Sequence, residues 1–583
     1  MIDNRGLSRA LSEMAELLEI EEANPFRVRA YRNASRIIAE QTRPIADRVA
    51  AGEDLKELPG IGKDIAAQLE ELVRTGRSTP LEEMFARIPR GVLELLRLPA
   101  LGPKRAKKLW QELGITSLES LGAAAREGRI ATLPGFSEAT QKKILENLAK
   151  DAGRERRLGI AIADSLVEAL LEHLRGAPGL ERVEAAGSYR RRRETVGDLD
   201  LLAVAADSQA VMERFVSYPG VEEIVGRGDT KSSVRLAASS GPGFQVDLRV
   251  VPAASFGAAW IYFTGSKDHN IKLRQRAVER ELKLSEYGLF RSDEEIVAGR
   301  DEAEVYAALG LAWVPPELRE DRGEFAAAAT GAASGGLPRL IERGDLRGDL
   351  QMHTTWSDGK NTVEEMVRGC LERGHQYCAL TDHSPALAMI RGLDPVRVRQ
   401  QAAEIAAVQE RVPGIRILRS AEVDIHADGS LDLDDETLAT LDVVLVSIHS
   451  RFELEPAAQT ERILRALENP RVQILAHPTG RKIGRRDAMR YDLDRVLSRA
   501  AELGVAVELD SHPDRLDLSD VALMRARELG TQIVISTDAH RVAHLDHLRY
   551  GVEQARRAWL EPAHVLNTRP LDEFLAALRR RPD

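Results

Sequence analysis

The sequence is poor in cysteine and has no long hydrophobic run. Its 583 residues include two cysteines, Cys370 and Cys378, whose spacing matches no zinc motif, so we expect free thiols in a reducing compartment. No stretch approaches the ~20 consecutive apolar residues that a membrane helix requires. The first residues mix charges into an amphipathic pattern, whereas a secretory signal needs a basic start and an apolar block. These absences predict a cytoplasmic protein.

An excess of positive charge is also missing. The 82 basic residues are outnumbered by 92 acidic ones, and the net charge of −10 argues against a protein that coats nucleic acid through a basic surface. It does not exclude an enzyme that acts on nucleic acid, because local basic patches can lie beside acidic metal sites. Histidine is unevenly distributed: of the 13, only His173 and His269 precede His353. This bias predicts a C-terminal domain that binds metal.

The chain length predicts several domains. Residues 1–152 show the pattern of short amphipathic helices, and residues 153–316 alternate β-type runs with helical stretches. A segment rich in Ala, Gly and Ser at 317–340 predicts a linker. Residues 341–583 alternate short apolar strands with amphipathic helices, which predicts a parallel barrel with its site at the carboxyl ends of the strands.

A Leu-Pro and glycine pattern recurs in the helical region. LKELPGIGKDIAAQLEEL starts at Leu55 and LLRLPALGPKRAKKLWQEL at Leu95, with a looser third copy, ATLPGFSEATQKKILENL, at Ala131. Glycine permits a tight turn that exposes backbone N–H groups at a helix N-terminus, where phosphate binds readily. A plain helical hairpin would explain one copy, but the recurrence favours contact with the DNA backbone. The copies resemble helix-hairpin-helix motifs, and the predicted contacts are Gly60, Gly62, Lys63, Gly102 and Lys104.

Three aspartates with apolar neighbours form a second pattern. Asp198 and Asp200 lie two residues apart in GDLDLL, so both side chains face one side of the expected strand, and Asp247 lies in a second strand, FQVDLRVV. Three convergent carboxylates can hold two Mg²⁺ ions, which activate a 3′-hydroxyl and neutralise departing pyrophosphate. A solvated strand edge would explain a lone Asp-x-Asp. The preceding GSYRRRRETV offers backbone, hydroxyl and guanidinium donors to a phosphate, which favours the metal site.

These segments resemble the palm and nucleotide-pocket motifs of the X family of DNA polymerases, best known from DNA polymerase beta. GSYRR, GDLDLL, VDLRVVP and YFTGSKDHN occur in the family's order, and the match covers about residues 1–315. The resemblance implies that the three aspartates are catalytic metal ligands and that a backbone-held aromatic leaves no room for a 2′-hydroxyl. The nucleotide-binding residues that it implies are Gly187, Ser188, Arg191, Gly197, Tyr262, Phe263, Gly265 and Asn270, with Arg274 on the minor-groove side of the DNA.

The first helical region departs from the eukaryotic relatives in one position. Their Schiff-base lysine, which removes a 5′-deoxyribose phosphate, aligns with Gln68, and glutamine cannot form an imine. Lys63 is near but displaced along the helix. Arg27 and Tyr31 still resemble a pocket for a 5′-phosphate. We therefore expect binding at the 5′ end of a gap without lyase activity at this position.

Polar side chains follow the apolar strands of the C-terminal region. DLQMHTTWSDG, ALTDHS, SAEVDIH, SIHS, LAHP and STDAH each contain His, Asp or Glu just past a strand. A lone histidine there is more often structural, but so many in register favour a hydrolytic site for Zn²⁺, Mn²⁺ or Fe²⁺. The pattern resembles the polymerase-and-histidinol-phosphatase (PHP) family, which implies a distorted β/α barrel that hydrolyses phosphoesters with up to three ions. The predicted ligands are His353, Asp358, His383, Glu422, His449, His477, Asp538 and His540.

One ligand of that family is replaced. The opening His-x-His is Gln351-x-His353 here, and because glutamine offers only a neutral oxygen, we expect one metal subsite to be weak. Asp358, where some relatives use histidine, could ligate or cap. The remaining histidines of the region match no ligand motif and are interpreted as surface residues: His375, His426, His512, His544, His547 and His564.

Together, the resemblances predict a multidomain enzyme with all-α helix-hairpin-helix domains, an α+β nucleotidyltransferase palm and a C-terminal PHP barrel. The expected activities are gap-filling DNA polymerisation in repair, such as base excision repair, with Mg²⁺, and a 3′–5′ exonuclease with Mn²⁺ or Zn²⁺. The expected substrates are gapped or nicked DNA and deoxynucleoside triphosphates, and we expect a monomer at the nucleoid, away from membranes.

Two alternatives stay open. The front could be a gap-binding module that delivers DNA to the phosphoesterase, or an active polymerase could carry a structural or small-metabolite-phosphatase PHP domain. The predicted boundaries are 1–85 and 86–152 for the helical domains, 153–253 for the palm, 254–316 for the nucleotide-pocket subdomain, 317–340 for the linker and 341–583 for the PHP domain.

Overall fold

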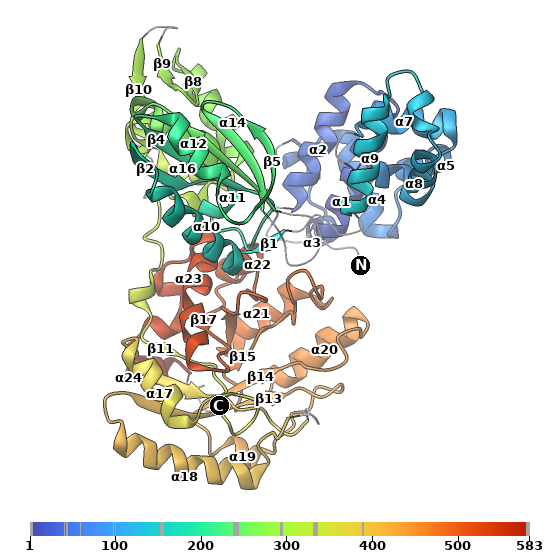
Figure 1. The fold of residues 1–583 in the computed structure, drawn as a ribbon. Helices are drawn as coiled ribbons and strands as arrows, with labels where there is room; N and C mark the ends of the chain where they lie inside the picture. The colour runs from blue at the N-terminus through green and yellow to red at the C-terminus, as the bar shows by residue number, and fades with distance from the viewer. Residues whose placement is uncertain are drawn as a thin grey trace. The chain divides into compact units, whose positions relative to one another are not determined.

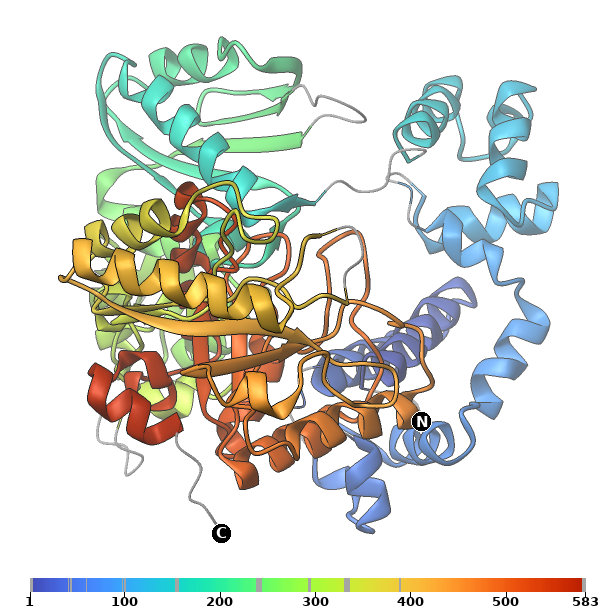
Figure 2. The same cartoon turned by 90° about the horizontal axis from the view of Figure 1, so that it is seen from below.

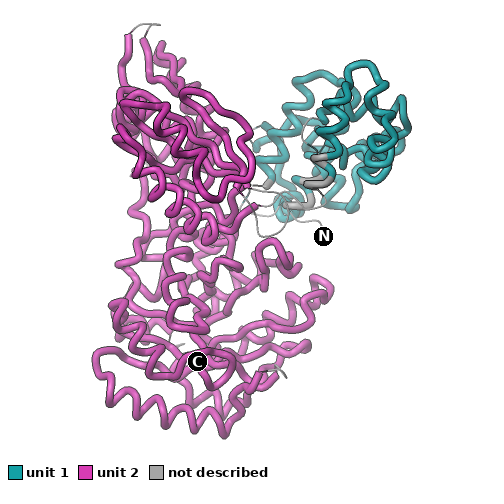
Figure 3. The backbone as a smooth tube through the Cα atoms, viewed as in Figure 1, with its two compact units in different colours: residues 1–156, 237–243 teal, residues 157–236, 244–583 magenta. Residues whose placement is uncertain are grey.

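The structure is a computed structural model that describes residues 4–578 apart from 40, 42–44, 59, 97, 99–100, 152–156, 237–243, 292–294, 330–335 and 387–389. The chain divides into two compact units, residues 1–156 with 237–243 and residues 157–236 with 244–583 (Figure 3). Among the described residues, no helix has the length and apolar character needed to cross a membrane. Cys370 and Cys378 are buried and form no disulfide.

The first unit consists of helices, as the sequence predicted. Their apolar faces bury one continuous core that extends from Leu7 to Ile144. The elements are α1 (Asn4–Ile20), α2 (Pro25–Ala39), α3 (Ile45–Ala50), η1 (Leu55–Glu57), α4 (Lys63–Thr75), α5 (Thr79–Arg87), α6 (Gly91–Leu95), α7 (Pro103–Leu113), α8 (Leu118–Arg126), η2 (Ile130–Thr132) and α9 (Glu138–Asp151) (Figure 1).

Glycines begin the helices after two of the hairpin turns. Gly62 precedes α4 and Gly102 precedes α7, and neither supplies a side-chain cap. A Cβ atom on either glycine would meet no atom within 4 Å, so the first N–H groups of both helices are open to approach. Gly60 has φ +83°, a conformation that favours glycine. Pro59 and Ala100, which belong to these motifs, lie outside the described residues.

A mixed five-stranded sheet carries the aspartates of the palm. Its strand order is β2-β4-β7-β6-β5, and β4 and β7 run parallel with Asp200 directly opposite Asp247. Apolar residues alternate along β7, so Asp247 lies on the less buried face. The elements are β1 (Leu158–Gly159), α10 (Ile160–Arg175), β2 (Leu180–Ala185), α11 (Gly187–Arg190), β3 (Thr195–Val196), β4 (Leu199–Ala205), α12 (Ser208–Val216), β5 (Val221–Arg227), β6 (Lys231–Leu236) and β7 (Phe244–Val250).

The next region adds helices and a small sheet of order β10-β9-β8. Its elements are η3 (Ala253–Ser255), α13 (Phe256–Thr264), α14 (Lys267–Val278), β8 (Lys283–Ser285), β9 (Gly288–Phe290), β10 (Ile296–Ala298), α15 (Glu302–Ala308), η4 (Pro316–Leu318) and α16 (Glu324–Ala328).

Part of the predicted linker is folded into this region. Glu324 is fully buried, accepts the N–H groups of Asp321 and Arg322 at 2.8 and 2.7 Å, and lies 2.8 Å from Nδ1 of His269. Composition predicted a linker from residue 317, but these contacts anchor α16. Residues 330–335 of the segment lie outside the described part of the chain.

Seven parallel strands, β11 to β17 in chain order, form the C-terminal barrel. The barrel nearly closes because Met352, after β11, forms a parallel bridge with Ala539, after β17. Helices α18 and α20 lie outside the strands in both views (Figures 1 and 2), and β14 is buried along its whole length, as parallel strands covered on both faces are. The predicted multidomain fold class is confirmed.

The elements of the barrel are η5 (Arg343–Asp345), β11 (Gly348–Asp349), α17 (Val363–Glu372), β12 (Tyr377–Leu380), α18 (Pro395–Arg411), β13 (Arg416–Asp424), α19 (Asp435–Leu438), β14 (Val443–Ser447), α20 (Pro456–Leu467), β15 (Ile474–Leu475), α21 (Leu493–Leu503), β16 (Ala506–Asp510), α22 (Asp520–Glu528), β17 (Ile533–Ser536), η6 (Val542–His547), α23 (Leu548–Arg557), η7 (Pro562–His564), η8 (Leu566–Thr568) and α24 (Leu571–Leu578).

Candidate active sites

The three aspartates of the palm converge where β4 and β7 lie side by side. Asp198 immediately precedes β4, and Asp200 faces Asp247 across the parallel pair. Burial, followed by the charges of Asp198 and Asp247, raises the pKa of Asp200 to about 7. Lys231 Nζ lies 3.7 Å from Asp247. Carboxylates that repel one another in this way, with oxygen as the donor atom, fit a hard divalent cation.

Helix α11 brings the predicted phosphate donors against these aspartates. Gly187 begins the helix with φ +63°, and a Cβ atom there would collide with Asp200 Oδ2, so glycine is required on both counts. Ser188 follows in the same helix. Gly197 directly precedes Asp198, and a Cβ atom there would lie 3.0 Å from the Arg157 guanidinium. The turn therefore places the Gly187 backbone beside the Asp200 carboxylate.

Arg191, predicted to bind the triphosphate, is engaged by the protein itself. Its Nε donates to Glu320 Oε1 at 3.1 Å, and a terminal nitrogen donates to the carbonyl of Thr264. Arg557, in α23 of the barrel, donates to the carbonyl of Arg191 at 2.7 Å and to Glu320 at 3.0 Å. A triphosphate would have to compete with Glu320 for this guanidinium.

The aromatic pair of the nucleotide pocket lies at the end of α13. Tyr262 is 38% exposed, and its ring packs edge-on against Phe263 with 5.1 Å between centroids. Asn270 Nδ2 donates to the carbonyl of Tyr262 at 2.7 Å, and Arg274 Nε lies 3.3 Å from the carbonyl of Asn270. Gly265, with φ +69°, ends the helix. The structure thus brings these predicted pocket residues together.

The residues predicted to contact DNA are mostly exposed. Lys63 and Lys104 lie uncovered in the first turns of α4 and α7, and Arg27 is exposed on α2. Tyr31 differs, because it is only 3% exposed and burial raises its pKa. Its phenol can therefore support Arg27 but offers little surface of its own.

Gln68 has the surroundings of a structural residue. It is 2% exposed, and its Nε2 donates to Ser78 Oγ at 2.6 Å inside the first unit. A side chain so enclosed has no open approach for a deoxyribose phosphate.

Glu422, at the end of β13, lies at the centre of the predicted histidine cluster. Its carboxylate is 2.7 Å from His477 Nε2, 3.1 Å from His383 Nδ1, 3.4 Å from His449 Nε2 and 3.5 Å from His353 Nε2. Burial opposes ionisation of Glu422, but the surrounding histidines hold its pKa well below the ordinary value. One carboxylate with two oxygens among four imidazoles can bridge two ions.

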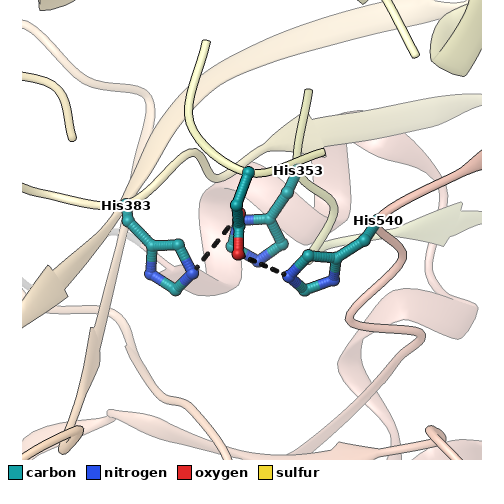
Figure 4. A group of neighbouring side chains, drawn as sticks. His353, His383 and His540 are labelled. Carbon is teal, nitrogen blue, oxygen red and sulfur yellow. Dashed lines mark ion pairs between the residues drawn. The ribbon is translucent and has the colours of Figure 1, made fainter. Parts of the chain in front are cut away.

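Asp358 joins a second group of ligands. Figure 4 shows His353 between His383 and His540. Asp358 lies 3.2 Å from His540 Nε2, 3.7 Å from His383 Nε2 and 3.8 Å from His353 Nδ1. Ligand atoms of the four residues lie within 4.8 Å of one another. Asp358 is therefore placed to bind the same ion as the histidines.

Asp538 completes a third group with His353 and Glu422. Its Oδ1 is 3.1 Å from His353 Nε2. Asp538 and His477 have φ values of +49° and +25°, conformations that are uncommon for non-glycine residues. All the predicted ligands of the C-terminal region thus gather at one mouth of the barrel, with imidazole and carboxylate donors suited to borderline divalent metals.

Gln351 is hydrogen-bonded to a buried carboxylate. With its amide nitrogen toward Glu508, it donates to Glu508 Oε2 at 2.7 Å, and the His477 N–H donates to the same oxygen at 2.7 Å. Burial, and then the charges of Asp510 and Asp538, raise the pKa of Glu508. Glu508 was not predicted from the sequence, although it lies near the end of strand β16, as the predicted ligands do in theirs.

Two further residues escaped prediction. Asp424 lies 3.3 Å from His449 Nδ1 and orients that ring. Arg515 is a partly buried cation 3.4 Å from Asp510 and 3.7 Å from Asp538. Arg515 lies in DSHPDRLDL, directly after β16. A run of polar residues after a strand was therefore the sequence feature that could have indicated it, as it did for the predicted ligands.

Comparisons with known proteins cover the same regions. Family models match at residues 2–78 (helix-hairpin-helix domain), 92–150 (SAM-like helix-hairpin-helix tandem), 259–320 (DNA polymerase beta thumb) and 349–564 (PHP domain). A probable phosphatase of Thermoanaerobacter sp. (strain X514) is 28% identical over 248 residues, 40% of this chain and 96% of that protein. One of Acetivibrio thermocellus is 31% identical over 202 residues, 33% of this chain and 78% of that protein.

A bacterial relative matches along the whole chain. The DNA polymerase/3′-5′ exonuclease PolX of Bacillus subtilis (strain 168) is 39% identical over 577 residues, 99% of both chains. Polymerase and PHP active sites of this kind require divalent metal ions. With the domain matches and the two clusters of metal-binding side chains, this shows that the chain belongs to the PolX family, X-family DNA polymerases that carry a C-terminal PHP domain.

Proposed function

We propose that this chain fills gaps in DNA during repair and removes nucleotides from 3′ ends in its PHP domain. The observation that carries the proposal is the presence of two convergent donor sets, the palm aspartates in register and the histidines around Glu422. We propose gapped or nicked DNA and deoxynucleoside triphosphates as substrates, and a monomer at the nucleoid of the cytoplasm. The proposed domain boundaries are those given from the sequence, with the linker shortened at its start by α16.

In the palm, Asp198, Asp200 and Asp247 would be the catalytic residues and hold Mg²⁺. When bound, the ions lower the pKa of the primer 3′-hydroxyl and neutralise the triphosphate. Asp200, whose pKa is about 7, has to give up its proton before all three carboxylates can act as ligands. Asp247 is supported from the side by Gln245 Nε2, which donates to it at 3.0 Å.

The residues around the carboxylates would hold the nucleotide. The α11 turn offers donors to the triphosphate, and the end of α13 presents its backbone and an aromatic ring to the sugar, which disfavours a ribonucleotide. The proposed nucleotide-binding residues are Gly187, Ser188, Arg191, Gly197, Tyr262, Phe263, Gly265 and Asn270. Arg274, exposed one turn after Asn270, would contact the DNA.

The first unit would bind the DNA backbone on either side of a gap. The open helix starts at Gly62 and Gly102, each followed by an exposed lysine, favour phosphate contacts that do not depend on base sequence. The proposed contacts are Gly60, Gly62, Lys63, Gly102 and Lys104, with Arg27, supported by Tyr31, at the 5′-phosphate. The enclosed amide of Gln68 argues against lyase chemistry there.

The PHP cluster would hold up to three ions of Mn²⁺ or Zn²⁺. When bound, such ions activate water and stabilise the charge of a phosphodiester under attack. Asp424 orients His449, and the partly buried Arg515 guanidinium supplies a positive charge beside Asp538. The proposed ligands are His353, Asp358, His383, Glu422, His449, His477, Asp538 and His540.

A single assay tests both activities. Labelled DNA with a short gap is incubated with Mn²⁺, with and without nucleotides, and strand lengths are followed. Wild type should extend with nucleotides and shorten without them. Asp198→Ala should lose extension and His449→Ala should lose digestion. Exposed Asp229→Ala and half-buried His564→Ala, both outside the two clusters, serve as matched controls.

The alternatives predict other outcomes in the same assay. A gap-binding front would leave extension absent in wild type, while digestion persists. A structural or metabolite-specific PHP domain would leave DNA undigested in wild type and His449→Ala alike. If the His449→Ala variant still digests DNA, the exonuclease active site lies outside this cluster.

A further inference from the structure

Three histidines outside the predicted ligand set gather on the barrel. His512 lies two residues after β16, and His544 and His547 lie in η6. Their ring centroids are 4.8 to 5.5 Å apart, and one ring nitrogen of each lies within 4.8 Å of the others. The sequence predicted surface residues, with His512 near the mouth of the barrel, but the structure makes the three a half-buried cluster, called here the triple-histidine cluster.

The surroundings favour neutral rings. Burial, then the neighbouring His512 and His544, lower the pKa of His547 to about 3. Nδ1 of His547 is buried and has no hydrogen-bond partner among the described residues. A buried nitrogen without a partner is costly, and a metal ion would satisfy it. Neutral imidazoles offer lone pairs to a cation, whereas binding of a phosphate would need protonated rings.

Existing contacts show which bonds would have to change. His544 Nε2 accepts from Arg541 Nε at 2.7 Å, and its Nδ1 faces the His540 N–H at 3.4 Å. His512 Nδ1 faces the Asp514 N–H at 3.3 Å, which leaves Nε2 for another partner. Arg541 is exposed and can turn away. The guanidinium is therefore the competitor for a cation at this place.

We propose that His512, His544 and His547 form a separate binding site for one borderline divalent ion such as Zn²⁺. Three imidazoles are a donor set that such ions accept, and water or a substrate oxygen would fill the remaining position. The carboxylates of Asp514, Asp538 and Asp546 add negative charge near the cluster, and Arg541 and Arg549 oppose it. The site shares no ligand with the cluster around Glu422.

The test counts ions on the full-length chain. Protein is dialysed to equilibrium against buffered Zn²⁺, and the metal per chain is measured by plasma mass spectrometry. His547→Ala and His544→Ala should each bind one ion fewer than wild type. His564→Ala, a histidine of the same region outside the cluster, should bind the same number. Circular dichroism melting and retained primer extension check that the variants fold.

A double variant separates this site from the PHP centre. His383→Ala should lose metal from the centre around Glu422, and His383→Ala with His547→Ala should lose one more ion, because the two clusters share no ligand. Arg541→Leu should bind the extra ion more tightly, because leucine has no donor to compete for His544 Nε2. If His547→Ala binds as many ions as wild type, or if the double variant binds as many as His383→Ala, the site does not exist.

Discussion

The palm and the PHP centre place buried carboxylates in opposite surroundings. In the palm, burial and the charges of Asp198 and Asp247 raise the pKa of Asp200 to about 7. In the barrel, Glu422 is buried more deeply, yet its pKa lies well below the ordinary value because His383, His449 and His477 adjoin it. Burial alone therefore does not decide the charge of a carboxylate; the sign of its neighbours does.

The difference has a consequence for how each site is assembled. The palm aspartates repel one another, and this repulsion together with burial raises the pKa of Asp200, so a bound cation would favour the state in which all three are ionised. The PHP ligands are held beforehand by contacts between imidazoles and carboxylates, such as the 2.7 Å pair of His477 and Glu422. Changes in one set should therefore leave the other set intact, and this independence can be tested.

The largest effect should come from Asp247→Ala. Loss of a metal ligand removes several kcal/mol of transition-state stabilisation, so primer extension should fall on the order of a thousandfold. Digestion of the same labelled strand without nucleotides should stay within about twofold, because the linked barrel keeps its own ligands. Single-turnover extension and digestion measure both, with Asp229→Ala as the control. A parallel loss of both activities would contradict two independent sites.

The reverse change is Glu422→Gln. It keeps the shape of the side chain but removes the charge that four histidines contact. Digestion should fall at least about a hundredfold, with extension unchanged. The bound metal, counted in the same samples, should fall with it. Normal digestion by this variant would place the exonuclease elsewhere.

A third buried carboxylate, Glu320, links the palm to the barrel, because it contacts Arg191 of the palm and Arg557 of the barrel. Although burial opposes ionisation, the arginines lower its pKa to about 2 from 4.5. The carboxylate therefore contributes stability that is complete above about pH 4.5 and is lost as the pH falls toward 2. Glu320→Gln should lower the free energy of unfolding at pH 7 by about 3 kcal/mol, and the difference should vanish in acid.

Urea unfolding across this pH range measures the effect of Glu320. Glu295→Gln, which breaks the exposed pair with Arg291, is the matched control and should cost less than about 1 kcal/mol. A difference between wild type and Glu320→Gln that persists unchanged at low pH would show that packing, rather than charge, accounts for it.

The smallest effect concerns Gln351→His. A histidine would supply the imidazole that the family pattern has at this position, so the half-saturating Mn²⁺ concentration for digestion should fall about tenfold. Extension should keep its metal dependence. An unchanged or weaker metal response would mean that the bond from Gln351 to Glu508 supports the site better than a new ligand does.

The order of elements and most of the site could be predicted because both leave local signals. Alternating strands and helices predicted the parallel barrel, and polar residues after strands predicted the ligands that now surround Glu422. The in-register Asp200 and Asp247 followed from two short apolar runs with an aspartate in each. The turn at Gly187 could also be predicted from its Gly-Ser sequence, and the φ of +63° explains why a glycine stands there.

Contacts between distant segments could not be predicted. Arg191 meets Glu320 and Arg557, which lie 129 and 366 residues away, and nothing in the arginine run indicates which carboxylate each side chain selects. The contact between Glu324 and His269, which lie 55 residues apart, could not be predicted for the same reason. The triple-histidine cluster depends on how η6 folds back beside His512, which no spacing in the sequence records.

The bridge between Met352 and Ala539 joins the first and last strands of the barrel between His353 on one side and Asp538 on the other. An ion bound by both residues would link the first and last strands of the barrel. Because an ion that binds only the folded state raises its free energy of unfolding, closure and metal occupancy should rise and fall together. We therefore expect metal starvation to shorten the lifetime of the barrel in the cell, so that supply of the ion governs how much of this domain survives proteolysis as well as how fast it works.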